Sequence, residues 1–169
     1  MRVVCLYPEV LGLEDHLIRI NKEVEAFKPA RIAVDSLSAL ERVSSIKSFR
    51  EFVVGLTSFI KHMEIAGLFT ATTPTLMGGT SVTETHISTI TDSIILLRYV
   101  EMYGEMHRGI TVLKMRGSAH DKNIREFTID AQGLNIGKQF RGVTGILSGN
   151  PYQRPPSDLD NLAELLEKR

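Results

Sequence analysis

A carboxylate ends one apolar run of the sequence. Ile32, Ala33 and Val34 are followed directly by Asp35, and an apolar run rich in β-branched residues is typical of a parallel strand buried on both faces. Ligands of such sheets bind beyond the carboxyl ends of the strands, so Asp35 is predicted to face a ligand site. A Walker-B strand ends in the same way and helps to hold Mg²⁺. An Asp that only caps a turn or helix gives the same pattern, and the spacing leaves both roles open.

A second stretch, residues 83–92, is rich in hydroxyl groups and reads TETHISTITD. Ser88 and Thr89 offer two adjacent hydroxyl nucleophiles. Glu84 and Asp92 are near enough in sequence to act as bases or to repel a new phosphate. The pattern favours phosphoryl acceptance, while the alternative is a polar connection whose hydroxyls cap backbone groups.

A third stretch, KMRGSAHDK from Lys114 to Lys122, places cations around a Gly turn. Arginine binds phosphate oxygens through a bidentate fork and lysine acts as a point charge, so this loop could clamp a phosphate. A solvated hairpin turn is the equally open alternative. An arginine finger acting in trans would require a neighbouring subunit to face it.

A phosphate-binding P-loop is not found in these residues. The sequence contains no G-x-x-x-x-G-K-[ST] motif, and the nearest candidate, at Gly137 and Lys138, lacks the leading glycine and the hydroxyl. The histidines His16, His62 and His107 show no metal-ligand spacing. The backbone cradle for ATP phosphates is therefore not expected within this chain.

Three segments, in the same order as in a known family, resemble that family. They are KPARIAVDSLSAL from Lys28, HISTITDSIILL from His86 and KMRGS from Lys114. They closely resemble the second ATPase domain of the KaiC family of RecA-like P-loop ATPases, over about residues 1–151. The P-loop and the paired catalytic glutamates that precede this region in the family are not present.

The resemblance implies a fold and an activity. The fold is α/β: an incomplete RecA-like P-loop ATPase domain with a parallel sheet flanked by helices, added antiparallel strands and an irregular C-terminal tail. The activity is that of an ATPase, Ser/Thr autokinase and autophosphatase of a circadian or related signalling protein, with ATP and Mg²⁺ held between subunits of a hexamer. Asp35 matches the Walker-B acid, as a catalytic residue and Mg²⁺ ligand.

The remaining site residues also follow from the resemblance. Ser88 and Thr89 match the phosphorylated pair, and Thr83 a further acceptor. The residues that would reach ATP bound by a neighbour are Lys114, Met115, Arg116, Gly117, Ser118 and His120. The segment that an activating partner would capture contains Thr144, Gly145, Ile146, Leu147, Ser148 and Gly149.

The expected partners are further copies of the chain or full-length KaiC-like subunits in a homo-hexamer, with KaiA- and KaiB-like clock proteins as candidates. The tail departs from the clock-type pattern at residues 151–156, PYQRPP. The expected division is a RecA-like portion over 1–142 and a loop and tail over 143–169. The chain could be a fragment of a longer product or a truncated paralogue. As a catalytically inactive paralogue it would serve as an interaction or regulatory module.

Alternating elements must position these residues. Apolar residues at three- and four-residue spacing predict a helix between Gly12 and Pro29, and a second helix with Ser48 as a candidate N-cap. Strands are predicted at residues 2–7, 31–35 and 67–72, and this β-α-β alternation implies a parallel sheet. Three further strands, at 93–100, 109–115 and 125–129, should be antiparallel because their connections are short. A short helix is expected over 159–166.

Composition is that of an ordinary globular chain. The 169 residues are 43% hydrophobic and 24% charged, and 20 basic residues balance 20 acidic ones, so nucleic acid is not an expected partner. The single Cys5 is expected to be a buried thiol, which suits a cytoplasmic location. No apolar stretch is long enough for a membrane span. Without a P-loop strand and helix, the sheet is expected to expose apolar edge and face.

Overall fold

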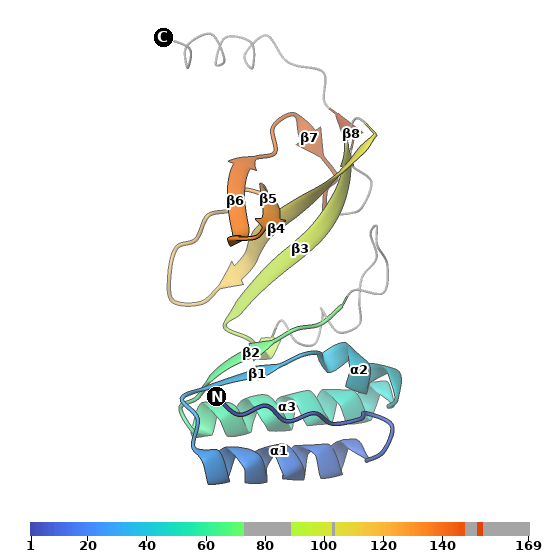
Figure 1. Ribbon diagram of the computed structural model, residues 1–169, viewed down its shortest axis with the longest axis vertical. Coiled ribbons are helices and arrows are strands. Elements are labelled where there is room, and N and C mark those ends of the chain that lie inside the picture. Colours follow the sequence, from blue (N-terminus) through green and yellow to red (C-terminus); the bar gives the residue numbers. More distant parts are fainter. Residues whose placement is uncertain (73–88, 103, 148–151, 154–169) are drawn as a thin grey trace. The chain divides into compact units, whose positions relative to one another are not determined.

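The computed structural model describes residues 1–72, 89–102, 104–147 and 152–153 (Figure 1). These residues fall into two compact units. The described part of the first comprises residues 1–72 and 89–91, and that of the second comprises 92–102, 104–147 and 152–153. The division predicted at residue 142 stays a prediction.

The first unit alternates helices with two parallel strands. Its elements are α1 (Leu13–Phe27), β1 (Arg31–Val34), α2 (Leu37–Arg42), α3 (Ile46–His62) and β2 (Ala66–Phe69). The two strands pair in parallel, with Arg31 opposite Ala66 and Val34 opposite Phe69. This confirms the predicted parallel arrangement. Helix α3 contacts β2, and α1 packs beside α3 (Figure 1).

Helix α3 provides most of the core of the first unit. Its apolar positions recur at helical spacing, and Phe52, Leu56 and Ile60 are each at most 3% exposed. On the same helix, a Cβ added at Gly55 would lie 2.9 Å from Leu17 Cδ2 of α1. The absence of a side chain at Gly55 therefore permits the close approach of these two helices.

Two expectations for the N-terminal segment are wrong. Residues 2–7 form no strand, and Cys5 is exposed rather than buried. Val3 is 72% exposed as well. Within the described residues, the sheet of this unit consists of β1 and β2, and residues 2–7 pair with neither strand, so their apolar side chains gain no cover from the sheet.

Helix boundaries also differ from the expectation. The N-cap of α3 is Ser45, not Ser48, because the Ser45 side chain accepts a hydrogen bond from the Ser48 backbone amide at 3.1 Å. Ser48 occupies the third position of the helix. Helix α2 was not predicted, since six residues are too few to establish a helical period.

The second unit is built on an antiparallel sheet. Its strands are β3 (Ser93–Met102), β4 (Glu105–Met115), β5 (Arg125–Asp130) and β6 (Gly133–Gln139), in the order β3-β4-β5-β6. The predicted antiparallel pairing of the first three is confirmed. Strand β6 was missed because its glycines suggested irregular structure. The hairpin β7 (Val143–Thr144) and β8 (Tyr152–Gln153) follows.

The two faces of strand β3 differ in exposure. Val100 is buried at 2%, whereas Ile95, Leu97 and Tyr99 on the other face are 48–58% exposed. β3 is also an edge strand of its sheet. Apolar exposure is predicted for the parallel sheet, where Leu68 of β2 is 64% exposed. Strand β3 adds a second exposed apolar face, on the antiparallel sheet.

Within the described residues, no helix is long and apolar enough to cross a membrane. The helix expected over 159–166 lies outside them.

Candidate functional site

Asp35 stands at the carboxyl end of β1, beside the end of β2. Its side chain is exposed, and its Oδ1 accepts a hydrogen bond from Thr70 Oγ1 at 2.5 Å. The Thr70 amide donates to Val34 O at 3.1 Å and thereby continues the strand pairing by one residue. The carboxylate is thus directed by the neighbouring strand, at the edge where ligands of parallel sheets bind.

Ser38 fixes the turn that follows Asp35. It is 5% exposed, and its Oγ accepts from the Thr72 amide at 2.7 Å and donates to Thr72 O at 3.3 Å. The Leu37 amide donates to Thr70 O at 2.9 Å. Because these bonds satisfy backbone groups of both strand ends, Asp35 is held on a rigid support.

Asp35 fits the role of a Mg²⁺ ligand. Mg²⁺ prefers oxygen ligands and is commonly held by one or two carboxylates together with substrate phosphates and water. A single exposed carboxylate with a hydroxyl beside it matches that mode. Among the described residues, no group of three His, Cys, Asp or Glu side chains is placed to hold a metal ion.

The predicted phosphoacceptors are only partly described. Thr83 and Ser88 lie outside the described residues, whereas Thr89 is exposed in a helical turn. The next residue, Ile90, packs against the hydrophobic core of the first unit. The packing of the partly buried Ile90 therefore holds this short turn against the core, while the Thr89 side chain is exposed.

The predicted phosphate-contacting residues lie at the end of β4 in the second unit. We call residues 114–123 the cation loop. The Arg116 amide donates to Asp92 O at 2.8 Å, and its guanidinium lies 3.6 Å from Asp92 Oδ1. Lys114 and Met115 are opposite Ile94 and Ser93 of β3. The cation motif is thus joined to the residue that begins the second unit.

The rest of the cation loop is open to solvent. Gly117 and Ser118 are exposed, and His120 is partly exposed. Gly117 has φ of +77°, a conformation that directs the chain out of β4 and that L side chains rarely adopt. Lys114 and Met115 thus end β4, and residues 116–120 continue from it as an exposed or partly exposed bend. Their contact with phosphate stays a prediction.

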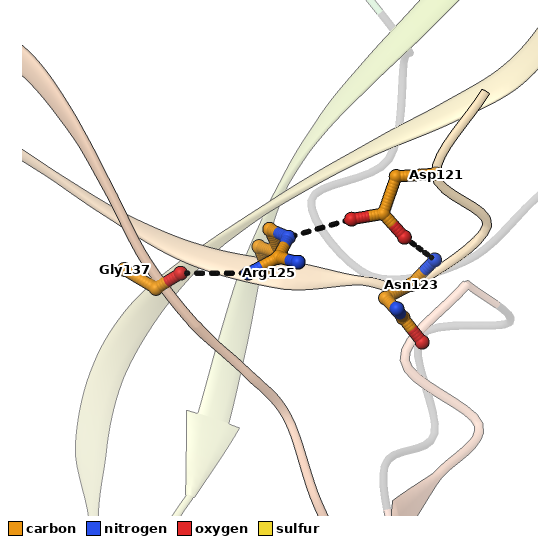
Figure 2. A network of polar contacts seen from close by, with 4 residues as sticks. All are labelled: Asp121, Asn123, Arg125 and Gly137. Atoms are coloured by element: carbon orange, nitrogen blue, oxygen red, sulfur yellow. Dashed lines mark hydrogen bonds and ion pairs between the residues drawn. The ribbon is translucent and has the colours of Figure 1, made fainter.

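A polar clip closes the far end of the cation loop (Figure 2). Asp121 accepts from the Asn123 amide at 2.9 Å and from Arg125 Nε at 2.7 Å, and Arg125 also donates to Gly137 O at 3.4 Å. The Asn123 amide, and then Arg125, hold the pKa of the Asp121 carboxyl below its ordinary value.

Sequence reasoning missed some of these supporting residues. Asp121-Lys122-Asn123 is the spacing of an Asx turn, and Arg125 stands four residues after Asp121, so both contacts had a local signal. Ser38 had no such signal, because its partner Thr72 lies 34 residues away.

The predicted partner-binding tail is described as far as Leu147. Thr144 pairs with Tyr152 in the β7–β8 hairpin, and Ile146 is buried at 4%. Ser148 and Gly149 lie outside the described residues. A partner that captured this segment by its apolar side chains would have to expose Ile146.

The sequence was compared with protein families and with known proteins, and both comparisons found KaiC proteins. The family model described as "ATPase: KaiC" matches residues 10–141. The circadian clock protein KaiC3 of Synechocystis sp. is 66% identical over 169 residues, covering 100% of this chain and 34% of that protein. The circadian clock oscillator proteins KaiC of Thermostichus vulcanus and Synechococcus elongatus are each 53% identical, covering 98% of this chain and 32% of their own length. The chain therefore spans about a third of these relatives.

Proposed function

Because the chain belongs to the KaiC ATPase family, we propose that it is the acceptor and cation-loop segment of an ATP-dependent Ser/Thr autokinase and autophosphatase. In this proposal it works at an interface between subunits of a homo-hexamer in the cytoplasm. The relatives are named as circadian clock proteins, and a role in a circadian or related signalling system is part of the proposal.

The observation that carries the proposal is the attachment of Arg116 to Asp92. The backbone bond of 2.8 Å and the ion contact of 3.6 Å tie the cation loop to the residue that follows the acceptor segment. Only Ile90 and Thr91 separate Thr89 from Asp92 in the chain. A cation motif and a hydroxyl pair joined in this way suit phosphoryl transfer.

Each residue has a defined task in this proposal. ATP with Mg²⁺ supplies the phosphoryl group when bound. Lys114 and Arg116 donate hydrogen bonds to phosphate oxygens and offset their charge, which is the main protein contribution to phosphoryl transfer. Asp35 shares in holding the cation. The hydroxyl of Ser88 or Thr89 would bond to the γ-phosphorus as its bond to ADP breaks, ADP would leave, and the hydroxyl proton would pass to Glu84 or Asp92, the acids near the pair in sequence. Since these residues contain no P-loop motif, the phosphate cradle has to come from outside them.

Substitution in the complete protein tests the proposal. The pair Ser88→Ala and Thr89→Ala should abolish phosphate incorporation but leave nucleotide binding unchanged. Lys114→Ala with Arg116→Ala should lower incorporation by weakening phosphate contacts. Lys122→Ala is the matched control, because this lysine lies in the same loop outside the KMRGS motif. Normal labelling of the double acceptor variant would contradict the proposal.

The alternative is a catalytically inactive module that joins a ring of complete KaiC-like subunits. One observation favours it: Ile95, Leu97 and Tyr99 form an exposed apolar row on the edge strand β3, and such a strand readily pairs with another chain. This module would assemble with a full-length relative without incorporating phosphate. Capture by KaiA- or KaiB-like proteins would be a further property of either form.

A further inference from the structure

His107 lies where three segments of the second unit meet. Its Nδ1 is 2.6 Å from Glu126 Oε1 of β5, and its ring meets the ring of Phe140 edge-on, with centroids 6.5 Å apart. The imidazole Nε2 is also 3.9 Å from Glu105 Oε2 on its own strand. The His107 side chain is 26% exposed and that of Glu126 is 41% exposed, so the contact is partly open to water.

The register of β4 and β5 places His107 near Glu126. Glu126 is directly opposite Gly109 in the sheet, and His107 is two residues before Gly109 on the same face. Diagonal cross-strand neighbours are about 7–8 Å apart, within reach of long side chains. A Cβ at Gly109 would lie 3.4 Å from Phe140, so a side chain there would compete for this space.

The pairing of β4 with β5 depends on this contact more than the pairing of β4 with β3. Strand β4 pairs with β3 from Met102 opposite Glu105 to Ser93 opposite Met115. With β5 the register includes only Gly109 opposite Glu126 and Ile110 opposite Arg125. A side-chain bond between His107 and Glu126 therefore adds a large share of what joins β4 to β5.

The same junction links the cation loop to the start of the tail. Ile124, directly after the cation loop, accepts a hydrogen bond at 2.9 Å from the amide of Phe140. Phe140 in turn lies just before β7 and packs against the His107 ring. The His107–Glu126 bond thus stabilises both the end of the cation loop and the segment that leads into the tail.

We propose that His107 is a pH-responsive positioning residue, whose protonation tightens its bond to Glu126 and holds Ile124 and Phe140 together. A neutral imidazole donates one ordinary hydrogen bond to Glu126. The protonated ring makes a charge-assisted bond, roughly twice as strong, and turns a second N–H toward Glu105. Arg98 of β3 shares this sheet face and opposes the added charge, but the two carboxylates outweigh it, one of them at 2.6 Å. Phe140 carries no charge.

The effect of His107 protonation on the bond between Ile124 and Phe140 is a property of the fold and does not depend on the proposed function. Its consequence for phosphate transfer does rest on that function: a firmer end of the cation loop should hold Lys114 and Arg116 more steadily.

Hydrogen exchange of the Phe140 amide in the full 169-residue chain tests the inference, with rates divided by the intrinsic rate at each pH. Protection should be about fivefold higher near pH 6 than near pH 8, from the gain of a charge-assisted over a neutral bond. His107→Asn should remove this ratio. Glu126→Gln keeps a hydrogen-bond partner but no charge, so it should keep the protection seen near pH 8 and lose the increase at pH 6.

His62→Asn is the matched control, because His62 is an exposed histidine in the last turn of α3 in the first unit. It should keep the wild-type ratio. A ratio near one in the wild-type chain, or an unchanged ratio in His107→Asn, would overturn the inference. A complete protein that transfers no phosphate but shows the wild-type Phe140 ratio would contradict the proposed function and leave the role of His107 standing.

Discussion

The candidate site residues are supported in two different ways in the two units. In the first unit, Asp35 follows a strand that rests on a helical core, and the turn after it is fixed by the buried hydroxyl of Ser38. In the second unit, the cation loop is fixed by exposed polar contacts, Arg116 with Asp92 and Asp121 with Arg125. Packing of buried apolar side chains depends little on salt concentration or pH, whereas exposed ion pairs become weaker at high salt and in acid.

This difference suits the proposed tasks of the two regions. A carboxylate that shares in holding a cation has to stay in one place, since small displacements cost much in catalysis. A loop that reaches toward a nucleotide on another subunit has to adjust as that subunit binds. We therefore expect substitutions in the first unit to act mainly on folding, and those in the cation loop to act mainly on ligand contacts.

The largest predicted difference between the two units is in the free energy of unfolding lost when a core side chain is shortened. Leu56 of α3 is fully buried at 0% exposure, so Leu56→Ala should destabilise the first unit by about 2–5 kcal/mol. Val100 of β3 is 2% exposed, and Val100→Ala removes fewer atoms, for roughly 1.5 kcal/mol. Urea unfolding of both variants measures the difference. Equal losses would mean that the two units are packed alike.

Ser38 provides the next test. Ser38→Ala leaves the Thr72 amide without its 2.7 Å partner beside a buried position, at a cost of about 1–3 kcal/mol. Ser44→Ala is the matched control, because Ser44, just after α2, donates its Oγ to Leu40 O of that helix at 2.8 Å and joins no two strands. The control should change the free energy of unfolding by less than about 0.5 kcal/mol. If both variants lost the same stability, Ser38 would have no special part in joining the strands.

Gly117 separates loop shape from ligand contact. Gly117→Ala strains a residue with φ of +77° and should cost about 1 kcal/mol. Gly104, at the turn between β3 and β4, has the same φ of +77° and equally open surroundings, so Gly104→Ala should cost the same. In the complete protein only Gly117→Ala should weaken nucleotide binding, measured by calorimetry. A matching loss in both variants would point to general destabilisation.

Acid should release the clip around Asp121, with a smaller effect. The folded pKa of this carboxyl is lowered, so its contribution to stability is present above the ordinary value of 3.8 and is lost as the pH falls through the folded pKa. The Asn123 amide resonance should therefore shift on acidification below pH 3.8 in the wild type. Asp121→Asn should remove that step. A step of the same size in the variant would assign it to another group.

Much of the fold could be predicted from local patterns. The helix over residues 13–27 has regular apolar spacing, and the strands around Val34 and Ile110 are apolar runs bounded by turn residues. What could not be predicted depends on partners distant in the chain. Residues 2–7 have the apolar pattern of a strand but pair with neither β1 nor β2, and Cys5 is exposed.

The candidate site divides in the same way. The positions of Asp35 after one strand and of Gly117 just after the end of β4 were predictable from apolar runs and a single glycine. The hydroxyl of Thr70 on Asp35 and the bond between His107 and Glu126 join residues 35 and 19 positions apart. Such contacts depend on strand order and register, which the sequence pattern alone left open.

The central claim, that Ser88 and Thr89 accept phosphate, is tested most directly by the mass of the native protein isolated from its own cells, followed by fragment mapping. The account predicts a species with added phosphate, localised to the peptide that contains Ser88 and Thr89 and removed by their substitution with alanine. A native protein that turns over ATP and never carries phosphate on that peptide would contradict it.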